Sequence, residues 1–226
     1  MLEMTEIFER RTAADIVFDR LQQEITALRL LPGTKLSESE VAKRFGVSRQ
    51  PVRDAFSRLA SLDMLLIRPQ KATEVRRFSM QRIAHARFVR LSVELEVIRS
   101  ACAVWNGPRA KVLDDSIAAQ RAAIDSADAE QFHALDYAFH TSLCELAGHP
   151  LASETIEAAK IKVDRLCVLS LGRAHEADAL WDDHRAMAAA LKRKDADAAC
   201  AAVRKHLSRL DDTIADIHAA HADYFE

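Results

Sequence analysis

The stretch FGVSRQPVRDAFSRLASLDM, from Phe45 to Met64, predicts a tight turn followed by a helix of about four turns. Gly46 stands where a preceding helix would end in a left-handed residue. Ser48 suits the N-cap of the next helix, and Pro51 falls in its first turn, where a missing N–H is tolerated. The apolar residues that recur at helical spacing, and so predict a buried stripe, are Val52, Phe56 and Leu59.

The polar residues at the start of this helix lie off the apolar stripe. Arg49, Gln50 and Arg53 are long side chains at the end of a helix that could enter a major groove. We expect Arg49 and Arg53 to contact guanine or phosphate. Ser48 and Gln50 are expected near the DNA backbone. The alternative is that the arginines are solvated surface charges, although residues 31–77 carry ten Lys or Arg against five acids.

The segments on either side of this helix complete a small domain. The elements expected there are a helix over residues 12–30, a short helix over 38–45, and β-prone runs over 65–68 and 73–76. Ser37 and Glu40 have the spacing of a capping box that opens the short helix. Three helices followed by a β-hairpin outline a winged helix-turn-helix, which we place at residues 1–77.

The rest of the chain, residues 78–226, predicts helices throughout. The expected helices span residues 79–105, 109–126, 128–146, 151–171, 176–194 and 195–221. Because the turns between them are short, we expect an antiparallel all-helical bundle of six helices. Five glycines and five prolines are few for 226 residues, which also favours a mostly α fold.

Composition and segment lengths narrow the class of protein. The formal net charge of −2 gives no sign of a nucleic-acid partner for the chain as a whole. No apolar run approaches the roughly 18–20 residues that cross a bilayer, and the acidic N-terminus does not resemble a signal peptide. The four cysteines lie in apolar helical contexts, which indicates buried thiols in a reducing cytoplasm: Cys102, Cys144, Cys167 and Cys200.

Four polar residues fall on the apolar faces of three predicted helices. Asp136 and His140 are four residues apart and share a helix face that overlaps an apolar stripe. His184 and His206 stand among apolar residues at helical spacing. Three imidazoles and one carboxylate suit a divalent ion such as zinc, and nickel or manganese would also fit. The alternative is that each histidine is a hydrogen-bonded core residue.

Two parts of the sequence resemble known families. Residues 30–75, LLPGTKLSESEVAKRFGVSRQPVRDAFSRLASLDMLLIRPQKATEV, closely resemble the N-terminal domain of GntR-type bacterial transcription regulators. The segments LDYAFHTSLCELAGHPLA (135–152) and DHRAMAAALKRKDADAACAAVRKHL (183–207) resemble the helical effector domain of the FadR subfamily, called FCD. The resemblance covers nearly the whole chain beyond the first ten residues.

The resemblance implies a role for several residues of the second domain. In metal-binding members of the subfamily, a D-x3-H, H and H pattern holds the ion, and a small carboxylate effector completes its coordination. In this sequence that pattern falls on Asp136, His140, His184 and His206. Arg90 and Glu94 match an R-x3-E pattern, so that Arg90 is a candidate to bind the effector carboxylate. The alternative for Arg90 is a salt bridge along or between helices.

The sequence departs from the GntR pattern at three places. The glycine that is usual at the tip of the wing corresponds to Ala72, and a left-handed turn would be strained there by a Cβ. The acidic-Gly pair after the recognition helix is Asp63-Met64. Some members carry a DNA-contacting arginine where this chain has Ser39.

Together these observations predict a cytoplasmic, homodimeric, ligand-responsive DNA-binding regulator rather than an enzyme. We expect it to bind a palindromic operator and to sense a small organic acid through a bound metal. Two alternatives remain open. The bundle could be a metal-dependent, hydrolase-like enzyme fused to a DNA-binding domain, or a metal-free dimerisation module.

Overall fold

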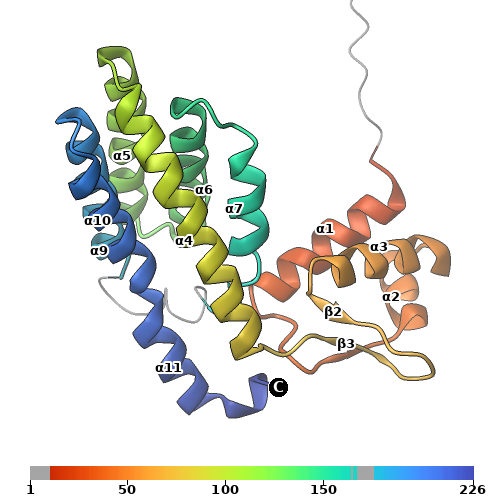
Figure 1. Ribbon diagram of the computed structural model, residues 1–226. Helices are drawn as coiled ribbons and strands as arrows, with labels where there is room; N and C mark the ends of the chain where they lie inside the picture. The colour runs from red at the N-terminus through yellow and green to blue at the C-terminus, as the bar shows by residue number, and fades with distance from the viewer. Residues whose placement is uncertain (1–10, 164, 167–175) are drawn as a thin grey trace, which may run out of the picture. The chain divides into compact units, whose positions relative to one another are not determined.

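The computed structural model describes residues 11–163, 165–166 and 176–226. The chain divides into two compact units, the first spanning Met1–Arg77 and the second Phe78–Glu226. Helices make up most of the described residues (Figure 1), and the prediction of a mostly α fold is confirmed.

The first unit contains three helices and a small sheet (Figure 1). Its elements are α1 (Ala13–Thr26), β1 (Lys35–Leu36), α2 (Glu38–Phe45), α3 (Arg49–Ser61), β2 (Leu65–Leu66) and β3 (Thr73–Val75). The strands pair antiparallel in the order β1–β3–β2. The hairpin β2–β3 was expected, whereas β1 was not, because a two-residue strand shows no periodicity in the sequence. Helix α1 also ends four residues before the expected boundary at 30.

The apolar stripe of α3 is the core of this unit. Val52, Phe56 and Leu59 are at most 2% exposed, and α3 packs against α1, where Leu21 and Ile25 are fully buried. Burial of each of these large side chains contributes about 1.5–3 kcal/mol to folding. The stripe therefore fixes which face of α3 points inward and leaves the opposite face to solvent.

The helix caps of the first unit differ from the expectation. Ser37 and Ser48 are N-caps, but neither side chain accepts a capping hydrogen bond. The Ser37 hydroxyl is instead 2.8 Å from the Ser39 hydroxyl. The capping box of this unit lies at the start of α1, where Thr12 and Asp15 exchange side-chain and backbone hydrogen bonds.

Left-handed residues mark the turns of the first unit. Gly46 has φ 65° after α2, as the sequence predicts. After α3 the left-handed residue is Asp63, with φ 60°, and aspartate tolerates this conformation better than most residues. In the wing the left-handed residue is Gln70, with φ 58°, and not Ala72. Pro69 before it favours a turn with positive φ at the following position. The prediction of backbone strain at Ala72 is therefore wrong.

The second unit is the predicted helical bundle (Figure 1). Its helices are α4 (Met80–Ala103), α5 (Gly107–Asp125), α6 (Ala129–Leu146), α7 (Ala152–Lys160), α9 (Glu176–Lys192), α10 (Ala196–Ser208), α11 (Leu210–Ala220) and the short η1 (Ala222–Tyr224). Helix α4 contacts α6, α7, α9 and α10. Ile98, Phe139, Met187 and Leu191 are at most 1% exposed in the core that these helices enclose.

Two predicted helices of the bundle have different bounds. The helix expected over 151–171 ends at Lys160 as an α-helix, and part of the range, 164 and 167–171, lies outside the described residues. The helix expected over 195–221 is divided at Arg209 into α10 and α11. There the Arg209 N–H bonds to His206 O, three residues back, and its guanidinium is held by Asp183 of α9. The six predicted helices thus correspond to seven α-helices among the described residues.

The described cysteines are buried, as their apolar sequence contexts predict. Cys102, Cys144 and Cys200 are buried free thiols, and Cys167 lies outside the described residues. Burial raises the pKa of the Cys144 thiol to about 11, which makes it unreactive. Of the helices described, none combines the length and the apolar character needed to cross a membrane.

Candidate metal centre and exposed helix

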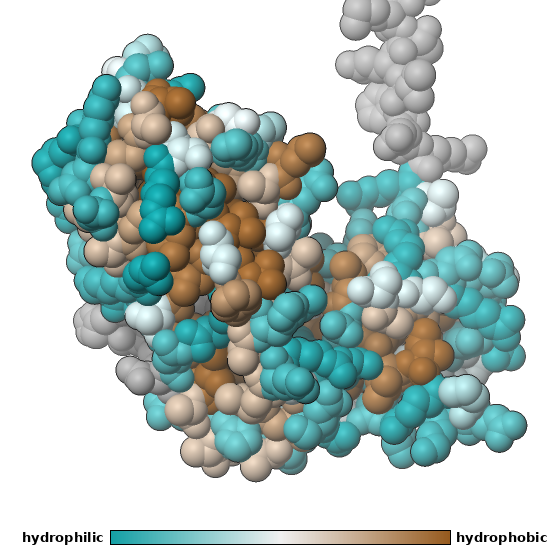
Figure 2. Space-filling model, in the orientation of Figure 1, coloured by the Kyte–Doolittle hydropathy of each residue, from teal (hydrophilic) through white to brown (hydrophobic). Residues whose placement is uncertain are grey.

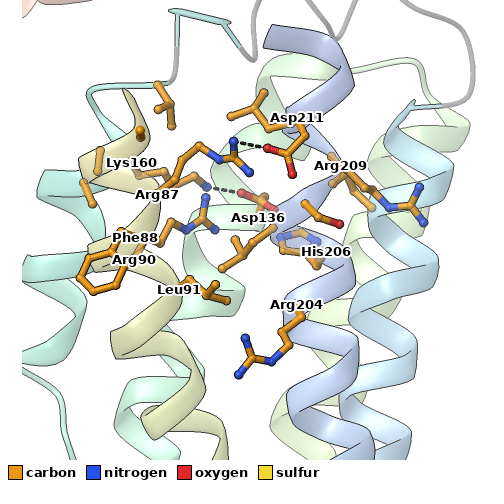
Figure 3. Close-up of a pocket in the computed structure, with 18 of the residues that line it drawn as sticks. Arg87, Phe88, Arg90, Leu91, Asp136, Lys160, Arg204, His206, Arg209 and Asp211 are labelled. Atoms are coloured by element: carbon orange, nitrogen blue, oxygen red, sulfur yellow. Dashed lines mark hydrogen bonds and ion pairs between the residues drawn. The ribbon is translucent and has the colours of Figure 1, made fainter. Parts of the chain in front are cut away.

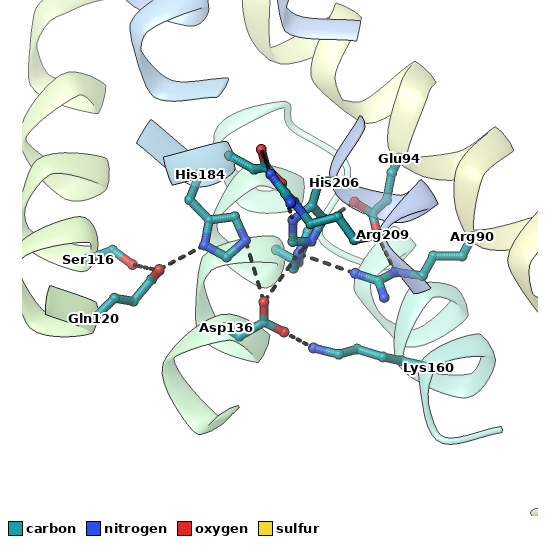
Figure 4. Close-up of polar contacts among 11 residues, drawn as sticks. Arg90, Glu94, Ser116, Gln120, Asp136, Lys160, His184, His206 and Arg209 are labelled. Atoms are coloured by element: carbon teal, nitrogen blue, oxygen red, sulfur yellow. Dashed lines mark hydrogen bonds and ion pairs between the residues drawn. The ribbon is translucent and has the colours of Figure 1, made fainter. Parts of the chain in front are cut away.

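Four buried side chains from three helices converge inside the second unit (Figure 4). Asp136 and His140 come from α6, His184 from α9 and His206 from α10. One potential ligand atom from each lies within 4.8 Å of the others. The Nε2 atoms of His140 and His206 are 3.2 Å apart, and His184 Nε2 is 3.4 Å from Asp136 Oδ1. The structure therefore brings together the four residues whose spacing suggested an inward-facing set.

Two of the three histidines have a side-chain oxygen within 3 Å of Nδ1, away from the centre. His184 Nδ1 donates to Gln120 Oε1 at 2.8 Å. His140 Nδ1 lies 2.9 Å from Glu94 Oε2. His206 Nδ1 is 3.9 Å from an oxygen of Asp183, too far for a hydrogen bond. An acceptor at Nδ1 holds the proton there and leaves the lone pair of Nε2 for a metal. His184 Nε2 has no hydrogen-bond partner within the described residues, so its lone pair is available to a metal.

Burial also sets the protonation of the cluster. Loss of water lowers the pKa of His184 to about 3 and that of His206 well below its usual value. Burial alone would raise the pKa of Asp136, but the Lys160 ammonium beside it holds that pKa well below its usual range. Neutral imidazoles and an ionised carboxylate are the forms that coordinate a metal. The donor set thus fits a divalent ion at neutral pH.

Two cations lie beside this centre. Lys160 of α7 forms an ion pair with Asp136, and its ammonium is 3.6 Å from the centre of the Tyr137 ring. Arg90 Nε donates to Glu94 Oε1 at 2.6 Å, while Arg90 Nη2 is 3.2 Å from His140 Nε2. Arg90 therefore makes the salt bridge that the sequence left as an alternative, and it also borders the centre.

The sequence-based prediction missed four residues that surround the centre. The sequence held a signal for each of them: a polar residue that stands three or four positions from apolar residues of a buried helix face. Gln120, for example, stands three residues after Ile117 and is fully buried. The missed residues are Glu94 as an acceptor, Gln120, Lys160 and Asp183.

A cavity of about 540 Å³ opens beside the centre (Figure 3). Its walls come from α4, α6, α7, α9, α10 and α11, and it reaches Asp136, His206, Arg90 and Lys160. Most of its remaining wall is apolar, and Figure 2 shows apolar residues gathered along α4 on this face of the second unit. A small molecule in this cavity would contact both the candidate metal ligands and two cations.

The residues proposed to contact DNA lie on the exposed face of α3. Arg49 Nη2 and Arg53 Nε are 3.1 Å and 2.8 Å from the same oxygen, Oε2 of Glu38. Gln50 Nε2 donates to Asp54 Oδ1 at 2.9 Å. Ser48 is exposed at the N-cap. Glu38 thus gathers the two arginines into one cluster at the N-terminal end of α3, a contact that the sequence did not reveal.

Family models match both units. The model described as "Bacterial regulatory proteins, gntR family" matches residues 13–75, and the model described as "FCD domain" matches residues 86–209. The chain is 34% identical over 209 residues to the HTH-type transcriptional repressor RspR of Escherichia coli (strain K12), a match that covers 92% of both chains. It is 33% identical over 215 residues to an uncharacterized HTH-type transcriptional regulator of Streptomyces ambofaciens, covering 95% of this chain and 90% of that one.

Solved structures share the fold. The structure titled "E. coli McbR/YncC" superposes with a TM-score of 0.72 at 20% identity, covering 93% of this chain and 99% of that one. A transcriptional regulator from Rhodococcus sp. RHA1 also gives a TM-score of 0.72, at 19% identity, covering 90% of this chain and 97% of the other.

Proposed function

The chain belongs to the GntR family of bacterial regulators and carries an FCD domain, and from this premise we propose that it is a metal-dependent sensor of a small carboxylate. Like its relatives and the members of its families, it is a transcriptional regulator and not an enzyme. In this proposal it represses transcription in the cytoplasm as a homodimer on a palindromic operator. The similarity to a named repressor over nearly the full length supports the direction of control.

The observation that carries this proposal is the convergence of four buried donors with oriented histidines. Three histidines and one carboxylate form a typical zinc site, and nickel or manganese would fit the same donors. A bound ion would supply a positive centre for a carboxylate group. Asp136, His140, His184 and His206 would hold the ion, while Gln120 and Glu94 would keep two of the imidazoles in the required tautomer.

Arg90 is the proposed protein partner of the effector carboxylate. Its guanidinium lines the cavity and is oriented by Glu94, which is 3% exposed. A planar guanidinium can bind a carboxylate through two parallel hydrogen bonds. The cavity next to the candidate ion therefore favours an organic anion over a neutral ligand.

Recognition of DNA is assigned to the start of α3. Arg49 and Arg53 would contact guanine or phosphate, and Ser48 and Gln50 would lie near the backbone. One helix covers only a half-site, so a symmetric dimer on two half-sites about one helical turn apart is expected. Binding of the effector would shift the population of states that differ in the placement of the two DNA-binding units.

The first test of the proposal measures sequence-specific DNA binding. Duplexes selected from a random pool by the purified protein should share an inverted repeat, and fluorescence anisotropy should give its Kd. Arg49→Ala and Arg53→Ala should each weaken binding by about fivefold to a hundredfold, the range of a bidentate contact to guanine. Arg99→Ala, on the exposed face of α4, is the matched control. Unchanged binding by both α3 variants would show that the assigned helix face is wrong.

The sensing half is tested by metal analysis. Protein purified without chelator or affinity metal should contain close to one divalent ion per chain, and removal of the ion should abolish thermal stabilisation by carboxylates. A protein that carries no ion, and that gains no stability from zinc, nickel or manganese, would leave the bundle as a metal-free dimerisation module.

A further inference from the structure

Among the described residues, every carboxylate packed around the candidate centre is already paired with a cation. Asp136 pairs with Lys160 and Glu94 with Arg90, while Asp183 pairs with both Arg209 and the exposed Lys205. The carboxylates are almost fully buried, so water screens these charges little. A divalent ion therefore brings two positive charges that these residues do not neutralise.

One carboxylate group neutralises only half of that excess. The cavity is also larger than one carboxylate needs, since about 540 Å³ equals the space of roughly eighteen water molecules. Pockets of this size hold molecules with many more atoms than acetate or lactate. The charge points to an anionic effector, and the volume points to an effector that extends beyond its metal-binding group.

The cavity wall offers a second site for a negative group at Arg204. Figure 3 shows the Arg204 guanidinium extending from α10 below Leu91 of α4, away from the paired Arg87 and Asp211. Other cations of the wall are engaged by carboxylates, whereas Arg204 has no ion pair with any residue in the described part of the chain. Its side chain is exposed, so it can reach a ligand without breaking a contact.

Apolar side chains line the same cavity as the two positive sites. Leu91 and Leu207 line the cavity on α4 and α10, and Phe88, which is 69% exposed, lies on the same wall of α4. Such a wall suits a short carbon chain, because contact with apolar side chains removes apolar surface from water. The residues thus provide an anion site, an apolar strip and a second anion site.

We propose that the effector is a dianion: a carboxylate that joins the metal, linked by a short carbon chain to a second carboxylate or a phosphate group that Arg204 binds. This inference rests on the proposed metal-dependent carboxylate sensor and adds the second group. It assigns Arg204 to specificity, since a monocarboxylate would leave the guanidinium unpaired.

The test uses the zinc-loaded full-length protein and calorimetric titration. The probes are matched in chain length: butyrate, pentanoate and hexanoate against succinate, glutarate and adipate, with 3-phosphonopropionate as the phosphorus-bearing probe. At least one dianion should bind ten times more tightly than the monocarboxylate of equal length. Arg204→Ala should weaken the best dianion by about tenfold or more, the loss expected for one charge-assisted hydrogen bond, and leave the monocarboxylates unchanged.

Controls separate this inference from the function on which it rests. Arg193→Ala removes an exposed arginine, in the turn after α9, that does not line the cavity and should change neither class of ligand. Equal affinity of matched monoanions and dianions, or equal weakening of both by Arg204→Ala, overturns the second anion site while carboxylate sensing stands. Failure of every probe to bind zinc-loaded protein overturns both proposals. Binding that persists unchanged after metal removal overturns the metal-dependent sensor.

Discussion

The stability that a bound ion adds should depend on His184. The imidazole is fully buried, stacks on Phe139 with ring centres 4.1 Å apart, and has its Nδ1 proton held by Gln120. His184→Ala removes one of four donors and also leaves a cavity. The packing loss lowers the melting temperature with or without metal. The relevant quantity is therefore the metal increment, the difference in melting temperature between zinc-loaded and chelator-treated samples of the same variant.

The size of the increment follows from mass action. Zinc at a thousand times its Kd stabilises the folded state by about 4.1 kcal/mol, or roughly 8–16 °C for a chain of this length. Loss of a donor should weaken zinc at least as much as loss of an outer hydrogen-bond partner, up to about a hundredfold. The remaining stabilisation is then about 1.4 kcal/mol, or roughly 3–6 °C.

Differential scanning fluorimetry with and without chelator measures both increments. The control is His149→Ala, because His149 is an exposed histidine in the turn before α7 and should leave the increment unchanged. A full wild-type increment in His184→Ala would show that His184 is not a ligand. Loss of the increment in His149→Ala would show that the ion binds elsewhere.

Three further predictions concern charge, protonation and backbone strain. Glu38→Gln should tighten non-specific DNA binding about two- to fivefold in fluorescence anisotropy, because Glu38 no longer holds Arg49 and Arg53; weaker or unchanged binding would refute this. In metal-free protein, the folded-state pKa of His184, about 3, lies below the unfolded value near 6.5, so unfolding takes up a proton. Urea unfolding should therefore show stability falling by about 1.4 kcal/mol per pH unit below pH ~6.5 for this residue, and a flat profile would contradict it. Gln70→Gly should raise the free energy of unfolding by about 0.5–1 kcal/mol by relieving a left-handed residue, and a loss of stability would rule out the turn described here.

The fold was largely predictable because its signals are local. A turn glycine, an N-cap serine, a proline in the first turn and an apolar stripe all lie within 45–64, and the helix forms where they indicate. The errors fall where local signals are weak or compete. Strand β1 is too short to show a pattern. The last predicted helix is divided at Arg209, whose side chain is held by Asp183 of another helix, and no local signal marks that position.

The sites were predictable only in part. Helical spacing identified Asp136, His140, His184 and His206 as inward-facing, since burial of a polar group on an apolar stripe is visible in the sequence. Spacing does not show which helices meet. The partners of these residues, including Lys160 and Gln120, come from other helices, and they could be assigned only after the helices were placed.

By itself, the amino-acid sequence determined the family, the helix that carries Arg49 and Arg53, and the four polar side chains that must face inward. These features depend on residue order over one or two helical turns, where periodicity and capping act. Only the tertiary structure decided that donors from α6, α9 and α10 meet within 4.8 Å, that Glu38 holds Arg49 and Arg53 of α3, and that Arg204 faces a cavity without a carboxylate partner among the residues described. These depend on contacts between segments far apart in the chain, which packing of the whole core sets and no local pattern encodes.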